Sequence, residues 1–339
     1  MKKILLLVLV LVVLGLAFFS WMFLGSATAF KEPKRTLYIG SDAATKGAVL
    51  DSLKKNNIIK NSAVFGWLAD RMDYWKKIKP GKYEIKNGSS SLTIIRMLRN
   101  GQQTPVNLVI TKLRTKGDLA RLVGNKLETD SLEMIRFLNS KNSLKTFGKT
   151  PELAMTMIVP DTYTYFWNTT APGVYKKLAD ESKKFWTPQR TERAVQLGLT
   201  PEQVYILASI VDEETNASAE KGTIASVYLN RIKKGMPLQA DPTIRFALND
   251  FTIKRIYGDH LDVASPYNTY RNKGLPPGPI STPSRKTIDA VLNTPATNYL
   301  YFVADSSFNG THVFSATYSE HRKKARAYQQ AFKRRFASN

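Results

Sequence analysis

The chain has 339 residues, of which 43% are hydrophobic, and it carries a formal net charge of +23. That length suits two folded domains and a tether, at about 100–200 residues per domain, and the hydrophobic content excludes a wholly disordered chain. The absence of cysteine excludes disulfides, thiolate chemistry and cysteine-based metal sites.

The positive charge favours a polyanionic partner, and three kinds fit: nucleic acid, anionic lipid head groups and bacterial wall polymers. Nucleic acid is disfavoured, because the sequence has no zinc-finger spacing, no RNA-binding aromatic signature and no basic recognition helix. We therefore expect no nucleic acid among the partners.

The N-terminus carries a hydrophobic run. Lys2 and Lys3 precede 21 uncharged residues, 4–24, and about 20 apolar residues span a bilayer as a helix. The lysines predict a cytoplasmic N-terminus with the remainder of the chain outside. A cleaved signal peptide is the alternative, since Ala27-Thr28-Ala29 resembles a cleavage site, but the run exceeds the usual 7–15 residues of a signal peptide. Residues 1–25 are predicted to be a cytoplasmic start and a transmembrane anchor.

The sequence pattern of residues 31–105 predicts a small α/β module. The pattern gives strands at 36–39 and 106–110, the second just beyond the module, and a turn into a strand at 79–85. It gives helices at 46–55, 63–72 and 91–99. Asn100-Gly101 closes the third helix in the usual C-terminal position.

Residues 106–339 predict a larger mixed α+β domain. The stretch 111–198 is mostly helical and basic, interrupted by an aromatic-rich loop or strand at 158–165. A capping box at 200–203 begins a helix that runs to about residue 215, and a second helix follows to Lys234. After a loop-rich stretch, 299–304 and 312–314 read as hairpin strands before a basic C-terminal helix. The overall expectation is an α+β fold behind a transmembrane helix.

One acidic residue stands out on the helix that begins at 201. Val204, Leu207, Ile210 and Val211 form an apolar face, and Glu214 continues that face at helical spacing. Burial raises a carboxyl pKa, and the negative end of the helix dipole acts in the same direction. A carboxyl held protonated near neutral pH can act as a general acid, whereas an ion-paired helix-end glutamate is the simpler interpretation. The same geometry turns the two preceding acids away from the apolar face and predicts mild effects for their substitution.

The stretch after this helix is rich in amides, tyrosines and rigid Pro/Gly loops, which suit a groove for a sugar chain, although ordinary turns use the same residues. Other chemistries find no support. The three histidines, His260, His312 and His321, lack zinc-ligand spacing, and no GxSxG or phosphate-binding loop is present. We therefore expect no metal and no cofactor.

Several ordered motifs resemble the YceG-like family, the endolytic murein transglycosylases. They are ASIVDEET at 208–215, ASVYLNR at 225–231, LQADPT at 238–243, YNTY at 267–270, GLPPG at 274–278, PDT at 160–162 and YLYFVA at 299–304. The resemblance covers nearly the whole chain, including the single N-terminal anchor.

The resemblance implies a LysM-like subdomain at 31–105 followed by a catalytic domain at 106–339. It places the catalytic acid/base on Glu214, the residue that the helical pattern singles out. It also implies that further family motif positions bind substrate: Glu220, Asn230, Gln239, Asp241, Tyr267 and Asn268.

The implied activity is endolytic cleavage of the MurNAc–GlcNAc bond in nascent peptidoglycan strands, which gives 1,6-anhydroMurNAc ends and helps to end strand elongation. The implied partners are peptidoglycan strands, the cytoplasmic membrane and peptidoglycan synthases of elongation or division. The implied location is the inner membrane, with the catalytic domain on its outer face. Two alternatives stay open: a muramidase that transfers to water, and a non-catalytic wall-binding scaffold.

Overall fold

The computed structural model describes residues 2–336 and shows a mixed α+β protein, as the sequence predicts. About half of it is helical. Within those residues the strands form three two-stranded sheets, β1-β2, β3-β4 and β5-β6. The chain divides into two compact units. The first unit runs to Leu108 and also includes Gly124–Thr129 and Thr164–Thr170. A single boundary at residue 105 would place these two segments in the second unit.

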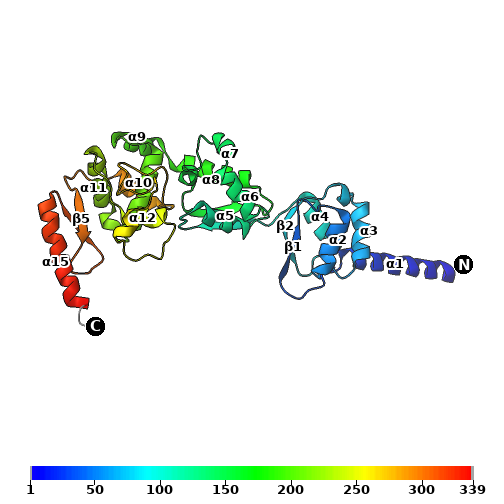
Figure 1. Ribbon diagram of the computed structural model, residues 1–339. Coiled ribbons are helices and arrows are strands. Elements are labelled where there is room, and N and C mark those ends of the chain that lie inside the picture. The colour runs from blue at the N-terminus through cyan, green and yellow to red at the C-terminus, as the bar shows by residue number, and fades with distance from the viewer. Residues whose placement is uncertain (1, 337–339) are drawn as a thin grey trace. The chain divides into compact units, whose positions relative to one another are not determined.

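The first unit contains a two-stranded sheet with helices packed on it (Figure 1). Its elements are α1 (Lys2–Leu24), β1 (Lys34–Ile39), α2 (Lys46–Lys55), α3 (Ser62–Arg71), the 3-10 turn η1 (Tyr74–Lys76), β2 (Gly81–Lys86) and α4 (Ser91–Asn100). The strands and helices predicted from the pattern in 31–105 are thus confirmed to within two residues at most ends.

Alternation along the antiparallel pair β1-β2 fixes the core of this unit. Lys34 lies opposite Lys86 and Ile39 opposite Gly81, so Leu37 and Tyr83 meet on the buried face. Gly101 ends α4 in the left-handed conformation, with φ of 68°, as the sequence predicts.

Helix α1 includes the hydrophobic run predicted at 4–24, although the side chains of residues 16–22 lie outside the described part of the chain. Among the residues that the structure describes, none of the helices is both long enough and apolar enough to cross a membrane.

The second unit is mainly helical and ends in a β-hairpin and a helix (Figure 1). Its first half, with β3 and β4 at the boundary, comprises β3 (Val106–Ile110), α5 (Lys116–Gly124), α6 (Ser131–Asn139), α7 (Lys141–Lys145), the 3-10 turn η2 (Ala154–Met157), β4 (Asp161–Tyr165), α8 (Ala171–Phe185) and α9 (Pro188–Gln196). Its second half comprises α10 (Pro201–Glu214), the 3-10 turn η3 (Ser218–Glu220), α11 (Lys221–Lys233), α12 (Asp241–Ala247), α13 (Gly258–Leu261), α14 (Arg285–Leu292), β5 (Tyr301–Ala304), β6 (His312–Ser315) and α15 (Tyr318–Phe336).

Helix α10 is the centre of the second unit. Thr200 caps it through the predicted box with Gln203, and Pro201 occupies its first turn. Every residue from Val204 to Asp212 is buried, because α11, α12 and α14 all pack against α10. Its last turn therefore starts in the core, and Glu213 and Glu214 at its end are partly exposed.

Candidate active site

Glu214 is the last residue of α10, where the helix emerges from the core into a cavity of about 310 Å³. The phenol of Tyr228, on α11, donates a 2.6 Å hydrogen bond to Oε1 of Glu214. Burial raises the pKa of Glu214 to about 7, the bond from Tyr228 opposes that rise, and the negative charge of Asp241 adds to it. The raised pKa therefore favours the protonated, proton-donating form of Glu214 near neutral pH.

Asp241 is the second carboxylate at the cavity and begins α12. It accepts a 2.5 Å hydrogen bond from the phenol of Tyr270. Burial raises the pKa of Tyr270 well above its usual range, with further contributions from the hydrogen bond and charge of Asp241, so Tyr270 stays a neutral donor. The two carboxyls thus have different surroundings, and Glu214 is the one suited to donating a proton.

Eight residues line the cavity. They are Glu214, Arg231, Leu238, Gln239, Asp241, Tyr270, Phe302 and His321. Three of the seven predicted site residues, Glu214, Gln239 and Asp241, are therefore brought together.

Arg231 holds the Gln239 side of the cavity in place. Its Nε donates to the Leu300 carbonyl at 2.7 Å, and its Nη1 donates to the Leu238 carbonyl at 2.8 Å and to Oε1 of Gln239 at 3.2 Å. Gln239 itself adopts a left-handed backbone conformation, with φ of 53°, which is uncommon for a residue with a side chain. A buried guanidinium thus fixes a strained turn beside the catalytic candidate.

Glu220 and Asn230 were predicted to bind substrate and do not line this cavity. Glu220 accepts hydrogen bonds from Thr215 at 2.7 Å and from the backbone and ring of His312 at 2.9 and 2.8 Å. The Asn230 amide donates to the carbonyls of Thr297 and Tyr299 at 2.9 and 3.0 Å. Both tie surrounding segments together, and their substrate contacts stay a prediction.

Tyr267 and Asn268 also lie outside the lining of the cavity. The ring of Tyr267 packs against Phe246 with ring centroids 4.7 Å apart. The Asn268 amide, fully buried, donates to the carbonyls of Leu261 and Val263 at 2.8 and 2.9 Å. These contacts order the loop that carries Tyr270, and direct binding of substrate by either residue stays a prediction.

Five lining residues were not among the predicted site residues: Arg231, Leu238, Tyr270, Phe302 and His321. Tyr228, which touches the catalytic candidate, was also missed, because an aromatic residue within an apolar helix reads as ordinary core. Arg231 and Tyr270 lie inside the motifs quoted for the family resemblance, so those motifs could have indicated them as site residues. His321 lies outside them, and its sequence context gives no such signal.

The expectation that Asp212 faces away from the core is wrong. Asp212 is only 7% exposed and receives Lys221 at 2.7 Å and Lys112 at 3.2 Å, with a further hydrogen bond from Thr287. Burial alone would raise the pKa of Asp212, but these partners hold it below its ordinary value. The amphipathic argument failed because α10 is surrounded by other helices.

Glu213 is partly buried rather than free in solvent, because Lys112 and Arg114 approach its carboxylate at 3.0 and 3.4 Å. Both cations of this contact thus hold the Glu213 carboxylate at the side of α10, outside the lining of the Glu214 cavity.

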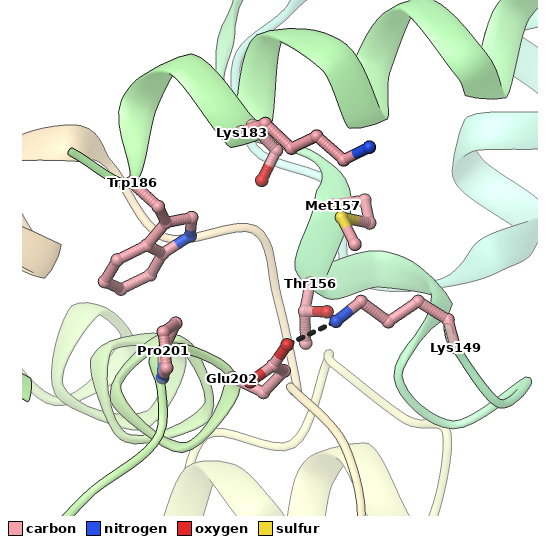
Figure 2. Close-up of a pocket in the computed structure, with 8 residues that line it drawn as sticks. Lys149, Thr156, Met157, Lys183, Trp186, Pro201 and Glu202 are labelled. Atoms are coloured by element: carbon pink, nitrogen blue, oxygen red, sulfur yellow. Dashed lines mark hydrogen bonds and ion pairs between the residues drawn. The ribbon is translucent and has the colours of Figure 1, made fainter. Parts of the chain in front are cut away.

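A second cavity, of about 230 Å³, lies between α8, η2 and the start of α10 (Figure 2). Lys149 forms an ion pair there with Glu202, and Trp186 faces the same space. Burial would raise the pKa of Glu202, but the bond from Lys149 and its neighbours lower it below the ordinary value. An ionised, paired carboxylate cannot act as a general acid, so the catalytic candidate remains Glu214.

Within residues 2–336, no group of three or more His, Asp or Glu side chains is placed to hold a metal ion. The Glu214 cavity offers proton transfer by a partly buried carboxyl, with Asp241 and amide and phenol groups nearby.

The sequence matches the family model described as YceG-like family over residues 38–327. A protein of Bacillus subtilis (strain 168) named endolytic murein transglycosylase is 29% identical over 321 residues, covering 88% of this chain and 86% of that protein. A Streptococcus pneumoniae (strain D39) protein of the same name is 28% identical over 286 residues, and the match spans 75% of this chain but about half, 51%, of that relative. The crystal structure of a yceG-like protein from Listeria monocytogenes superposes with a TM-score of 0.56 at 25% identity, covering 86% of this chain and 99% of that one.

Proposed function

The chain belongs to the YceG-like family, and from that membership and the buried acid we propose that it is an endolytic murein transglycosylase. The substrate would be the glycan strand of peptidoglycan, cut between MurNAc and GlcNAc to leave 1,6-anhydroMurNAc ends. The observation that carries the proposal is Glu214 in its cavity, with a pKa of about 7.

The proposed reaction needs one carboxyl in two roles. Protonated Glu214 gives its proton to the oxygen of the glycosidic bond as that bond breaks. The resulting glutamate then takes the proton of the MurNAc C6 hydroxyl, whose oxygen attacks C1 and closes the anhydro ring. The proton returns to Glu214 and no water is consumed.

The pair of carboxylates that glycosidases ordinarily use is not required by this route. General acid–base catalysis contributes about 10²–10⁴-fold, so positioning in the cavity must supply the remaining acceleration. The hydrogen bond from Tyr228 suits the second half of the reaction, because it stabilises the glutamate that forms.

A muramidase is the second candidate, since Asp241 shares the cavity and could orient a water molecule. The carboxylate of Glu220 is less suited to that role, because it already accepts bonds from Thr215 and His312. Asp241 is thus the better candidate for a hydrolytic site. A non-catalytic wall-binding scaffold is the third possibility.

One digest separates these candidates. Purified glycan strands are incubated with the wild type and with Glu214→Gln, and the new ends are identified by mass spectrometry. Anhydro ends, lighter by one water than hydrolysed ends, made only by the wild type support the proposal. Reducing ends would favour the muramidase, and no product from a folded wild type would favour the scaffold.

We also propose that residues 4–24 anchor the protein in the cytoplasmic membrane with its catalytic domain outside. The support is the uncharged run after Lys2 and Lys3, together with exposed apolar side chains from Ile4 to Leu14. A reporter fused after Asn339 should be active only outside the cytoplasm. A shortened, soluble exported protein would instead indicate a cleaved signal peptide.

The LysM-like subdomain at 31–105 is proposed to bind GlcNAc-containing glycan, with peptidoglycan synthases as further partners of the whole protein. A 106–339 fragment should bind isolated wall sacculi more weakly than the full chain, and the binding should weaken with salt because the protein is strongly basic. Equal binding and cleavage by the fragment would contradict this role.

A further inference from the structure

His321 brings the C-terminal helix to the cavity of Glu214. It lies in the first turn of α15, whose start is held by a reciprocal pair of hydrogen bonds: Glu320 N donates to Oγ1 of Thr317 at 3.2 Å, and Thr317 N donates to the Glu320 carboxylate at 3.4 Å. This arrangement is a capping box, which fixes the backbone beneath His321. The position of the ring is thus set by local sequence.

The ring of His321 is held by stacking as well. It lies nearly parallel to the ring of Tyr301 on β5, at 22° with centroids 5.3 Å apart. Arg231 covers Tyr301 at 5.3 Å from the ring centroid. Tyr301 thus contacts both the guanidinium and the imidazole, and the ring contact leaves the imidazole little freedom to rotate.

The polar atoms of this stack are not all satisfied. Nδ1 of His321 is buried and has no hydrogen-bond partner among the described residues. Arg231 uses Nε and Nη1 for carbonyls and for Gln239, while Nη2 bonds to no residue in the described part of the chain. A buried polar atom without a partner, such as Nδ1 of His321, is uncommon in folded proteins and indicates a missing bonding group.

The charge state of His321 is compatible with donation from one nitrogen. Burial and the nearby charge of Arg231 hold the pKa of His321 below its ordinary value of 6.5, so the imidazole is neutral at neutral pH and carries one N–H. In the same lining, Glu214 and Asp241 supply carboxyl groups. The lining therefore holds both carboxyl groups and the N–H donors of Arg231 and His321.

We propose that His321 binds substrate, and that its N–H and Nη2 of Arg231 receive the acetamido carbonyl oxygen of an N-acetylated amino sugar beside Glu214. Sugar hydroxyls both donate and accept, whereas the acetamido carbonyl only accepts, so it suits the N–H groups of His321 and Arg231. Phe302, on the same lining, adds an apolar surface that the acetyl methyl group can contact. This assignment rests on the proposed glycan-cleaving function and deepens it.

The test compares kcat/KM on two glycan preparations, native strands and strands chemically freed of their acetyl groups. His321→Phe keeps the stack on Tyr301 and removes both ring nitrogens. We expect it to lose about tenfold on native strands, the size of one hydrogen bond of about 1.4 kcal/mol, and to match the wild type on deacetylated strands. Repulsion between Arg231 and the exposed amine acts on both proteins and cancels in this comparison.

Two further variants make the test specific. Lys323→Ala changes an exposed residue two positions along α15 and should retain the acetyl preference of the wild type. His321→Gln restores a donor and should recover part of that preference. If the phenyl ring does not fit, His321→Ala repeats the comparison, with thermal unfolding measured for every variant.

The outcomes distinguish the role of His321 from the proposed glycan-cleaving function. A His321→Phe protein that loses activity equally on both preparations, or keeps the full acetyl preference, overturns the assignment of His321. A folded wild type that cleaves neither preparation contradicts the proposed function itself.

Discussion

The phenol of Tyr228 donates a 2.6 Å hydrogen bond to Oε1 of Glu214 and is almost wholly buried, with 1% of its surface exposed. Burial raises the pKa of Glu214 to about 7, and this bond keeps the pKa from rising further. The pair therefore sets the pH at which the proposed acid is both protonated and able to lose its proton.

Tyr228→Phe should move the pH dependence of cleavage. Removing the donor destabilises the glutamate, so the pKa of Glu214 rises further above its ordinary value. The free enzyme needs protonated Glu214, and the fall of kcat/KM on the alkaline side should shift to higher pH. We expect the best rate to fall by about tenfold or less, because one donor to the forming carboxylate is lost. An unshifted pH profile would show that Tyr228 does not influence the pKa of Glu214.

Glu214→Gln should stabilise the fold, and more so at high pH. The pKa of Glu214 is raised on folding from 4.5 to about 7, so its favourable contribution is complete below pH 4.5 and is lost as pH rises through 7. The amide cannot ionise and avoids that loss. The melting temperature of the variant minus that of the wild type should therefore be larger at pH 8 than at pH 5. A difference that does not change with pH would contradict the raised pKa.

Much of the fold could be predicted because its signals are local. The capping box at Thr200, the glycine that ends α4 and the alternation in β1 each fix an element through neighbouring residues. The family resemblance, carried by short motifs, is confirmed by the family match over 38–327.

The lining of the site could be predicted only in part, because it depends on how distant elements pack. Glu214 was found from helical spacing, but the same spacing placed Asp212 on an exposed face. Helix α10 is enclosed by other helices from Val204 to Asp212. The sequence pattern of one helix does not indicate which other elements pack against its polar face. His321 reaches the cavity from a helix about a hundred residues further along the chain, a relation that only the packing of α15 on the β5-β6 hairpin creates.

Chelation should leave cleavage unchanged. The proposed reaction uses the proton of Glu214 and draws on no metal ion, so EDTA removes nothing that the chemistry needs. Activity is measured before and after dialysis against the chelator, with substrate glycan dialysed in the same way. Full loss, restored by one divalent cation, would overturn the mechanism.

Glu220→Gln should act through positioning. Its carboxylate joins Thr215, just after Glu214, to His312 on β6, and the amide would set an N–H against one of these donors. We expect a loss of about 1–3 kcal/mol in the free energy of unfolding, the cost of an unsatisfied buried group. We also expect kcat to fall with KM little changed. A raised KM with unchanged stability would instead favour the direct sugar contact that the family resemblance implies.

Asp212→Asn should be strongly destabilising, contrary to the mild effect that the helical pattern predicts. The variant leaves Lys221, at 2.7 Å and 12% exposed in its side chain, without its charged partner. Loss of one member of a buried pair costs about 3–5 kcal/mol, which should lower the melting temperature by roughly 5–15 °C.

Asp180→Asn is the matched control for this substitution, because Asp180 pairs with Lys176 on the exposed face of α8 and such pairs contribute about 0–1 kcal/mol. The effect of Asp212 should also depend on pH. Its pKa is lowered on folding, so its contribution is present above the ordinary value of 3.8 and is lost as pH falls through the folded-state value. The melting temperatures of wild type and Asp212→Asn should thus converge in acid. Equal, small effects of the two substitutions at neutral pH would show that the buried network around Asp212 does not hold the end of α10 in place.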